Sequence, residues 1–504
     1  MDELDRRIRS ELLAYTDPSG VDGLVRTTGD RLPSRRSRTP LFVRLAAAVS
    51  LLALVGAGLA LFPGLGGTRP DPRASASAQT ASPTTASPWW TRWQRLPTTE
   101  GVFTGGPDAS GTDGGQFIAE IVSTPTGLVA VGTTSDADHR KDAAVWTSSD
   151  GIRWSRVAND GSFGADAVTP RDDFSDGNQG MGGVARWGEQ LIAVGGEDSA
   201  LDPSTTLRAA VWVATDPMTW ERLTPEAPAF AGAAMGDVVV FGDRLIAVGV
   251  QPDGTGGLDS AVWTSLDGRR WERVENQPAF EGADMWQVVV FGDRLVAFGR
   301  TGNEAGQDDG AVWTSDDGEA WLRIEDDDAF GGPGWQQING VTVVSGSVVA
   351  VGTSYVLHDD HREDRSVGVV WLSRDGENWR RVDDARGVFA TDPLTSIEGV
   401  TAAGPGAIAV GSRAIPGEAP NAFDDRSRAA VWFSADGAVW EPLSHRPEFS
   451  SEPRLTMARI SVADDGRLIA FGTSYRELGS PPGTSEGDIA VWISDAPEGA
   501  LEVP

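Results

Sequence analysis

The stretch "AVWTSDDGEAW", residues 311–321, decides the fold, because close copies of it recur along the chain. Two of the copies read "AVWTSSDGIRW" at 144–154 and "AVWFSADGAVW" at 430–440. Each copy holds an apolar segment of strand length, a turn rich in Ser, Asp and Gly, and a second segment that begins with Trp. The chain is therefore expected to be built from repeated β-hairpins.

Each hairpin belongs to a repeat of about 50–66 residues that also holds two earlier strand-like segments, such as "DVVVFG" and "RLIAVG". Four short antiparallel strands in about 50 residues are typical of a propeller blade. The Trp of the third strand occurs seven times, at Trp146, Trp212, Trp263, Trp313, Trp371, Trp432 and Trp492. The Trp of the fourth strand follows only six of these, at Trp154, Trp220, Trp271, Trp321, Trp379 and Trp440.

The missing fourth strand lies at the other end of the repeat region. "WQRL", which begins at Trp93, matches "WSRV", "WERL" and "WERV" of the complete repeats. A strand taken from the N-terminal side would close the ring and cover two exposed sheet edges. The sequence predicts an all-β fold, a seven-bladed β-propeller closed by an N-terminal strand and preceded by one transmembrane helix.

The turn between the third and fourth strands repeats an aspartate, at Asp150, Asp216, Asp267, Asp317, Asp375 and Asp436. Asp-Gly between alternating strands favours a two-residue type I′ turn, in which both residues have positive φ. Such a turn would place Trp154 opposite Thr147, so that the two indoles of a blade face opposite sides of the sheet. The repeated motif is interpreted as a structural joint, with the Ser residues before it bonding the turn backbone.

This spacing resembles the Asp-box of sialidase-like propellers, with one residue fewer between Asp and Trp. The resemblance implies a bacterial, membrane-anchored propeller in which the Asp turns lie away from the active site. Sialidase chemistry in that family would need three arginines, a Tyr–Glu pair and an acidic Asp. Tyr355 or Tyr475 could supply the phenol, with Glu363 or Glu477 nearby. The recurrent arginines do not fit, because they fall in fourth strands and in first–second turns.

Composition excludes several functions. The formal net charge is −31, and residues 1–62 hold nine Arg against seven Asp or Glu, so the negative charge lies in the remainder of the chain. Such a surface repels nucleic acid. The chain has no cysteine, which excludes disulfides and thiolate chemistry. No cofactor motif is evident.

Four segments are expected along the chain. The uncharged run 45–62 is long enough to cross a bilayer, and the arginines before it predict a cytoplasmic N-terminus. A cleaved signal peptide is the alternative, with "SASA" at 75–78 as its cleavage site and Arg35–Arg36 as a twin-arginine signal. The predicted segments are a cytoplasmic tail (1–40), a transmembrane helix in contact with the lipid bilayer (41–62), a Pro/Ser/Thr/Ala-rich stalk (63–88) and the propeller (89–504).

The longer connections share one face of a meandering propeller, and we expect a ligand there. A Phe recurs on this face in every blade, which argues for packing. Residues that occur in one or two blades are better ligand candidates, namely Tyr355, Tyr475, Trp286 and Trp335. "HDDHRED" places His358 and His361 among carboxylates, which fits either a bound cation or a hydrated loop.

The expected function is recognition of an extracytoplasmic protein, peptide or glycan by a single-pass membrane protein. No catalytic residue is assigned. The alternatives are a sialidase-like glycoside hydrolase, and a scaffold or assembly factor for a membrane complex, similar in outline to the propeller factor of photosystem II assembly.

Overall fold

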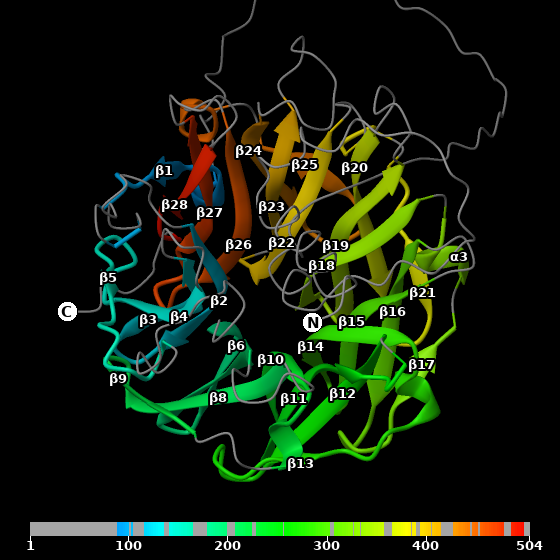
Figure 1. Ribbon diagram of the computed structural model, residues 1–504. Coiled ribbons are helices and arrows are strands. Elements are labelled where there is room, and N and C mark those ends of the chain that lie inside the picture. Colours follow the sequence, from blue (N-terminus) through cyan, green and yellow to red (C-terminus); the bar gives the residue numbers. More distant parts are fainter. Residues whose placement is uncertain are drawn as a thin grey trace, which may run out of the picture.

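A computed structural model of the chain is a seven-bladed β-propeller, as the repeats predict (Figure 1). It describes residues 88–497 except 100–101, 104–114, 136–140, 165–178, 199–206, 224–227, 256, 303–306, 326, 333, 357–364, 385, 390–393, 405, 415–426, 444–445, 452–453 and 478–484. The tail, the transmembrane segment and the stalk before Pro88 lie outside the described residues. In the part that is described, no helix has the length and apolar character needed to span a bilayer.

Each blade is a four-stranded antiparallel sheet in which consecutive strands pair. Blade 1 holds β2 (Gln116–Thr124), β3 (Gly127–Ser135), β4 (Lys141–Ser148) and β5 (Ser155–Arg156). Blade 2 holds β6 (Gln179–Trp187), β7 (Gln190–Asp198), β8 (Leu207–Asp216) and β9 (Thr219–Arg222). Blade 3 holds β10 (Ala234–Phe241), β11 (Arg244–Pro252), β12 (Leu258–Ser265) and β13 (Glu272–Arg273). Blade 4 holds β14 (Ala283–Phe291), β15 (Arg294–Gly302), β16 (Asp308–Ser315) and β17 (Leu322–Ile324).

The second half of the ring repeats the pattern. Blade 5 holds β18 (Trp335–Val344), β19 (Ser347–Val356), β20 (Arg365–Ser373) and β21 (Trp379–Arg381). Blade 6 holds β22 (Thr395–Ala403), β23 (Gly406–Ala414), β24 (Ser427–Ser434) and β25 (Trp440–Pro442). Blade 7 holds β26 (Leu455–Val462), β27 (Leu468–Glu477), β28 (Ser485–Ser494) and β1 (Trp93–Arg95). The short helices are η2 (Trp89–Thr91), η3 (Pro228–Phe230), η4 (Pro278–Phe280), η5 (Pro447–Phe449) and α3 (Asp327–Phe330).

The predicted closure is confirmed. β1 pairs antiparallel with β28 and is the outer strand of blade 7 (Figure 1). Trp93 lies opposite Ser494 and Arg95 lies opposite Trp492. The same register joins Trp379 to Ser373 and Arg381 to Trp371 in blade 5. The N-terminal strand therefore replaces the missing fourth strand residue for residue.

The predicted type I′ turn is wrong. Thr147 lies opposite Ser155, with seven residues between them, and in blade 5 Ser373 lies opposite Trp379, with five residues between them. A two-residue turn would instead place Thr147 opposite Trp154. Asp150 supplies the reason, because its Oδ1 accepts the backbone N–H groups of Ile152 and Arg153 at 2.9 and 2.7 Å. Positive φ occurs at Gly151 (70°), whereas Asp150 is not among the positive-φ residues. The Asp side chain therefore caps a wider turn.

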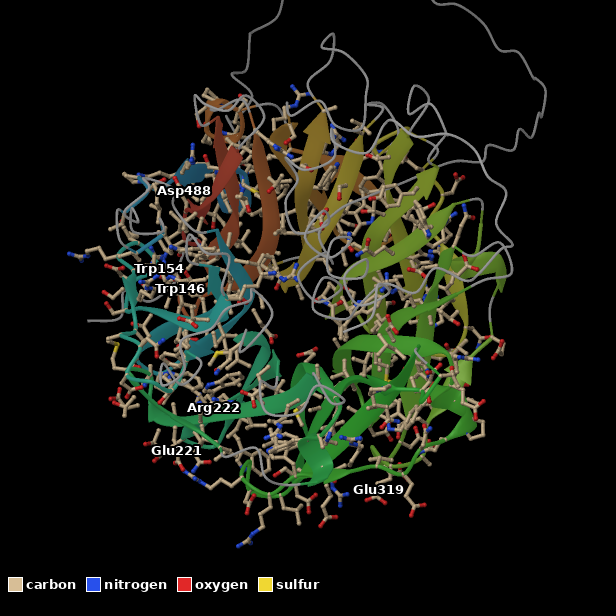
Figure 2. All side chains as sticks on the ribbon, in the orientation of Figure 1. Trp146, Trp154, Glu221, Arg222, Glu319 and Asp488 are labelled. Atoms are coloured by element: carbon tan, nitrogen blue, oxygen red, sulfur yellow. The ribbon has the colours of Figure 1, made fainter. Side chains whose placement is uncertain are left out.

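The wider turn also corrects the expected orientation of the indoles. Trp146 and Trp154 lie on the same side of blade 1, in one cluster with Ile469 and Phe471 of blade 7 (Figure 2). The same arrangement holds around the ring, because each pair of Trp residues packs on the preceding blade. Each interface therefore receives both indoles from one blade, and not one from each neighbour as expected.

A hydrogen bond fixes the inner Trp of six blades. Its indole N–H donates to the carbonyl of the residue before the recurrent Phe, over 2.6–2.9 Å, as Trp146 does to Val102. The recurrent Phe residues are all buried in the blade interfaces, at Phe103, Phe163, Phe230, Phe280, Phe330, Phe389 and Phe449. Trp and Phe therefore form one joint at each interface.

Blade 6 lacks the arginine that the other blades have in the fourth strand, and an arginine of its second strand replaces it. Its fourth strand has Pro442 opposite Trp432, where the other blades have Arg. Arg413 of the second strand takes the missing place, with its guanidinium carbon 5.2 Å from the centre of the Trp432 ring. Arg413 also donates to the carbonyl of Val388, the group that the indole would otherwise use. Within the described residues, the Trp432 N–H has no hydrogen-bond partner.

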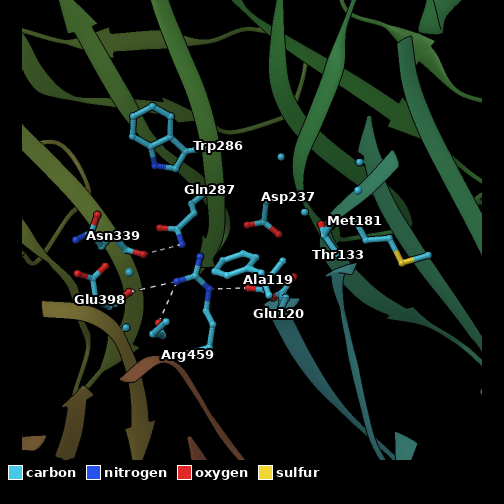
Figure 3. A pocket seen from close by; sticks show the side chains of 18 of the residues that line it. Ala119, Glu120, Thr133, Met181, Asp237, Trp286, Gln287, Asn339, Glu398 and Arg459 are labelled. Atoms are coloured by element: carbon cyan, nitrogen blue, oxygen red, sulfur yellow. Dashed lines mark hydrogen bonds between the residues drawn. The ribbon is translucent and has the colours of Figure 1, made fainter. Parts of the chain in front are cut away.

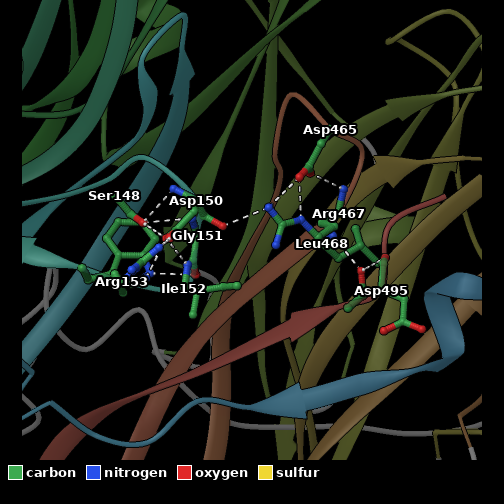
Figure 4. A network of polar contacts seen from close by, with 11 residues as sticks. Ser148, Asp150, Gly151, Ile152, Arg153, Asp465, Arg467, Leu468 and Asp495 are labelled. Atoms are coloured by element: carbon green, nitrogen blue, oxygen red, sulfur yellow. Dashed lines mark hydrogen bonds and ion pairs between the residues drawn. The ribbon is translucent and has the colours of Figure 1, made fainter. Parts of the chain in front are cut away.

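Arginines in the first–second turns join neighbouring blades on the short-turn face. Arg467 of blade 7 forms an ion pair with Asp465 and donates to the carbonyl of Asp150 in blade 1 at 3.0 Å (Figure 4). Arg244 of blade 3 forms an ion pair with the carboxylate of Glu319 in blade 4 at 2.9 Å. These arginines therefore hold the ring together and are unavailable to a ligand on the opposite face.

Replacing Trp93 with Ala should destabilise the propeller by about 3–5 kcal/mol, because it removes a buried indole from the closing interface. Thermal and chemical unfolding of the purified protein measure the loss. Leu322→Ala is the control, because this side chain is 60% exposed and its loss should change stability by no more than about 0.5 kcal/mol. Equal stability of wild type and Trp93→Ala would contradict closure by β1.

Candidate functional site

All seven first strands carry a β-bulge at the same place. In β2 the register shifts between Ile118 and Glu120, and the other six strands shift at the equivalent position. A bulge re-aims the side chains beside it. We call the two residues at each bulge the axial pair, and the seven pairs are Ala119-Glu120, Gly182-Gly183, Gly236-Asp237, Trp286-Gln287, Asn339-Gly340, Glu398-Gly399 and Ala458-Arg459.

The axial pairs surround a cavity of about 660 Å³ on the propeller axis (Figure 3). All of their residues except Gly183 line it. Neighbouring first strands approach closely here, since a Cβ on Gly183 would lie 2.8 Å from the Cα of Asp237. Glycine at several axial positions therefore lets the strands converge, while the other positions place polar side chains at the centre.

Two carboxylates connect neighbouring blades around the cavity. Glu120 accepts the backbone N–H of Val184 in the next blade at 2.7 Å. Asp237 accepts the N–H groups of Val238 at 2.7 Å and of Val288, again in the next blade, at 2.9 Å. Each carboxylate therefore has a structural hydrogen bond and also faces the axial space.

Burial governs the protonation of these groups. Burial raises the pKa of Glu120 well above its usual value, and the negative charge of Asp237 adds to the effect. Burial also raises the pKa of Asp237 to about 6, against the hydrogen bonds from Val288 and Val238 and the charge of Arg459. The cavity thus holds carboxyl groups that bind protons more readily than exposed ones.

Arg459 is the cation among the axial pairs. Its Nε donates to the carbonyl of Ala119 at 2.6 Å, and its Nη1 donates to those of Ala458 at 3.0 Å and Glu398 at 3.5 Å (Figure 3). Burial lowers its pKa, while the charges of Glu398, Glu120 and Asp237 oppose that change. The guanidinium is therefore bound by bulge carbonyls from three blades.

Trp286, Gln287 and Asn339 form a further part of the cavity wall. The indole of Trp286 donates to the carbonyl of Ile338 at 3.3 Å, and Gln287 Nε2 donates to that of Asn339 at 3.2 Å. Asn339 Nδ2 donates to Thr353 Oγ1 at 3.1 Å and to a backbone carbonyl. Within the described part of the chain, Asn339 Oδ1 and Gln287 Oε1 are buried and accept no hydrogen bond. This wall therefore has hydrogen-bond acceptors to spare.

Of the ligand candidates named from the sequence, some line the cavity and others do not. Trp286 lines the cavity. Trp335 and Tyr355 pair across blade 5 with ring centres 5.4 Å apart, and neither lines the cavity. Tyr475 lies opposite Gly487 in blade 7, and its side chain is not described. The cation site expected at His358 and His361 lies outside the described residues.

Sequence reasoning missed Glu120, Asp237, Glu398 and Arg459, although a signal was present. Every first strand reads (Ile/Met)-x-x-(Val/Ile), as in "IAEI", "MGDV" and "MARI", and the two variable positions are the axial pair. The recurrent arginines were placed in fourth strands and turns, and Arg459 lies in neither. Among the described residues, no group of three or more His, Asp or Glu is arranged to hold a metal ion.

Comparison with known proteins places the chain in a family. The family model of the DUF6242 beta propeller domain matches residues 214–482, which is more than half of the chain. The chain belongs to this DUF6242 beta-propeller family. No curated protein matches it significantly in sequence.

Solved structures resemble this DUF6242 propeller in fold. Trypanosoma rangeli sialidase in complex with sialic acid is 12% identical with a TM-score of 0.41, over 80% of this chain and 58% of the sialidase. The chain thus spans less than two thirds of that enzyme. A protein of unknown function from Dyadobacter fermentans is 11% identical with a TM-score of 0.40, over 80% of this chain and 98% of that one. A thermostable family-43 glycoside hydrolase is 13% identical with a TM-score of 0.32, over 54% of this chain and 96% of that one.

Replacing Asp237 with Asn should flatten the pH dependence of stability between about pH 4 and 6. The folded protein holds the Asp237 proton up to about pH 6, and the unfolded chain releases it near its usual pKa, so the free energy of unfolding falls as the pH rises through this window. Urea unfolding at a series of pH values measures the slope.

Asp267→Asn provides the matched control. Backbone hydrogen bonds from Arg270 and Arg269 lower the pKa of this turn carboxyl, against a smaller effect of burial. Its stabilising contribution is therefore present at neutral pH and is lost only as the pH falls below its usual pKa. Asp267→Asn should lower stability near pH 7 and leave the slope between pH 4 and 6 unchanged. An unaltered slope in Asp237→Asn would show that Asp237 does not titrate in this range.

Proposed function

We propose that the chain is a membrane-anchored extracytoplasmic recognition protein that binds its ligand in the axial cavity. Residues 41–62 would anchor it in the bilayer, and the propeller would face outward. The observation that carries the proposal is the diversity of the axial pairs. No two blades share the same pair, whereas the inner Trp is identical in all seven. Positions that only support the fold repeat around the ring, and the axial positions do not.

The lining of the cavity reaches toward the face with the longer connections. Its lining includes first-strand starts, such as Gln116 and Gly180, and second-strand ends, such as Val250 and Thr473. In a meandering blade these ends lie on the long-connection face. The second strands end on this face, so the connections that vary from blade to blade in the sequence would contribute to recognition of a protein, peptide or glycan.

Recognition fits the site better than sialidase-like hydrolysis. Among the described lining residues, Arg459 is the single arginine, and bulge carbonyls already bind its guanidinium. A carboxylate-binding triad of arginines is therefore not formed there. Tyr355 packs its ring against Trp335 away from the cavity. These contacts favour a binding site over a glycoside-cleaving centre, and no contact of the described residues favours a scaffold role.

Filling the cavity should abolish ligand binding. Thr401 lines the cavity and is half-buried, so Thr401→Trp places an indole in the axial space. The full-length protein in detergent, tested on glycan and peptide arrays, should bind ligands that this variant loses. Leu266→Trp is the matched control, because Leu266 lies 67% exposed beside an Asp turn. Binding that survives Thr401→Trp but is lost in Leu266→Trp would move the site to the short-turn face.

Alkaline carbonate extraction tests the anchor. The full-length protein should stay in the membrane fraction, because an apolar helix at 41–62 would be held by the hydrocarbon core. Immunoblotting with antibodies to the N-terminal tail and to the propeller should detect one species of full length. Release of a shorter species that lacks the tail would instead establish cleavage of a signal peptide.

A further inference from the structure

We infer that the chemical group bound at the axial cavity is a cation with N–H donors, either an ammonium or a guanidinium. This inference rests on the proposed function, because it takes the cavity as the ligand site. Three features of the cavity point to this class of ligand: its charges, its unused hydrogen-bond acceptors, and the way it already binds the guanidinium of Arg459.

The charges at the centre of the cavity are unequal. Glu120, Asp237 and Glu398 stand against Arg459 alone among the axial pairs. The other charged residues of the lining are Lys141, at the start of β4, and Asp284, which forms an ion pair with Arg300 at 3.1 Å. Buried charge without compensation is costly, and a ligand with positive charge would reduce this cost.

Among the axial pairs, the unused hydrogen-bonding capacity is also of one kind, whereas Gln116, which lines the cavity at the start of β2, has an unused donor and an unused acceptor within the described residues. Asn339 is only 3% exposed and lines the cavity, and its Oδ1 accepts no hydrogen bond from the described residues. Gln287 Oε1 is in the same state, while the Nε2 of Gln287 and the Nδ2 of Asn339 are both in use. A buried acceptor that lacks a donor is destabilising, because it has lost its hydrogen bonds to water. The partner missing at these two oxygens is therefore a donor, and the surplus of carboxyl groups favours a donor that carries positive charge.

Arg459 shows how the axis accommodates such a group. Its guanidinium is held by carbonyls of the bulged residues Ala119, Ala458 and Glu398, with its central carbon 5.5 Å from the centre of the Phe117 ring. The rest of the lining offers comparable groups, namely the Asp237 carboxyl, the Asn339 amide oxygen and the Trp286 ring, whose centre lies 5.4 Å from the guanidinium carbon of Arg300. The cavity thus binds one guanidinium of the chain and retains acceptors for a second cation.

The protonation of the carboxyl groups supports this reading. Glu120 and Asp237 interact electrostatically with each other and with Arg459, which also interacts with Glu398. Burial raises the pKa of Glu120 and of Asp237. Without a ligand, a proton therefore neutralises part of the surplus charge. A bound ammonium or guanidinium would take over this role.

The test uses full-length protein in detergent, labelled with 5-fluorotryptophan and observed by 19F NMR. Trp286→Phe assigns the Trp286 resonance, which reports on the cavity. Methylguanidinium and 1,5-diaminopentane are the cationic probes, methylurea is the neutral isostere of the guanidinium, and sialic acid is the anionic probe, all at constant ionic strength. The cationic probes should shift the Trp286 resonance in a saturable manner, and the other two should not.

Variants separate the cavity from the general negative charge of the surface. Asp237→Asn and Glu120→Gln should each weaken binding of the cationic probes at least tenfold, and thermal unfolding checks that each variant is folded. Glu272→Gln removes one exposed carboxylate from the outer strand of blade 3 and should leave the affinity unchanged. If one cavity variant fails to fold, the other decides the outcome. Equal weakening in Glu272→Gln, or none in a folded cavity variant, would overturn the inference.

A short peptide with one central Arg distinguishes the two sources of such a group. Saturable binding of the small cations supports a free amine or guanidine as the ligand. Binding of the peptide alone, lost in Asp237→Asn, supports the side chain of a partner protein. If methylurea or sialic acid shifts the Trp286 resonance as strongly as the cationic probes do, the ligand is not restricted to cations. The cavity would then remain the ligand site. If no probe shifts this resonance, the inference fails, and the array experiment decides separately whether the cavity binds a ligand.

Discussion

The structure depends on the joint between neighbouring blades, in which a buried indole donates to the carbonyl before a buried Phe. The bond gives the polar edge of the indole a partner inside an otherwise apolar interface. Blade 6 shows how strongly this place is constrained. Where Pro442 replaces the usual arginine, Arg413 arrives from another strand and bonds the same carbonyl. Six such joints, together with the interface of blade 6 in which Arg413 bonds the carbonyl, fix the spacing of the blades and hence the width of the axis.

A ring held at that width brings the first strands together so closely that many axial positions accept only glycine. The remaining axial positions carry Glu120, Asp237, Glu398 and Arg459, which are expensive to bury. Proteins commonly retain such destabilising groups where function requires them, and stability is then supplied elsewhere. Here the apolar interfaces between blades supply it, with seven inner Trp side chains that are fully buried. The repeated and the unrepeated residues therefore serve different ends.

Much of the fold could be predicted from the sequence, because the number of repeated Trp residues fixes the number of blades and shows which strand is missing. Seven third-strand Trp residues against six fourth-strand ones required Trp93 to complete the last blade, and it does. The turn could not be predicted from Asp-Gly alone, because the side chain of Asp150 caps backbone groups and widens it. That error reversed the expected face of Trp154. The axial residues were missed for a similar reason. A bulge of one residue changes which side chains reach the axis, and hydrophobic alternation does not reveal a bulge.

Closure and the cavity are physically connected through Arg459. This residue belongs to blade 7, the sheet that β1 completes, and its guanidinium bonds carbonyls in blades 6, 7 and 1. It therefore spans the junction where the two ends of the repeat region meet. Arg467 crosses the same junction at the short-turn face, through the carbonyl of Asp150 (Figure 4). A displacement of β1 would disturb blade 7 and with it the one axial cation, so the geometry of the cavity depends on a strand that directly follows the proposed anchor and stalk.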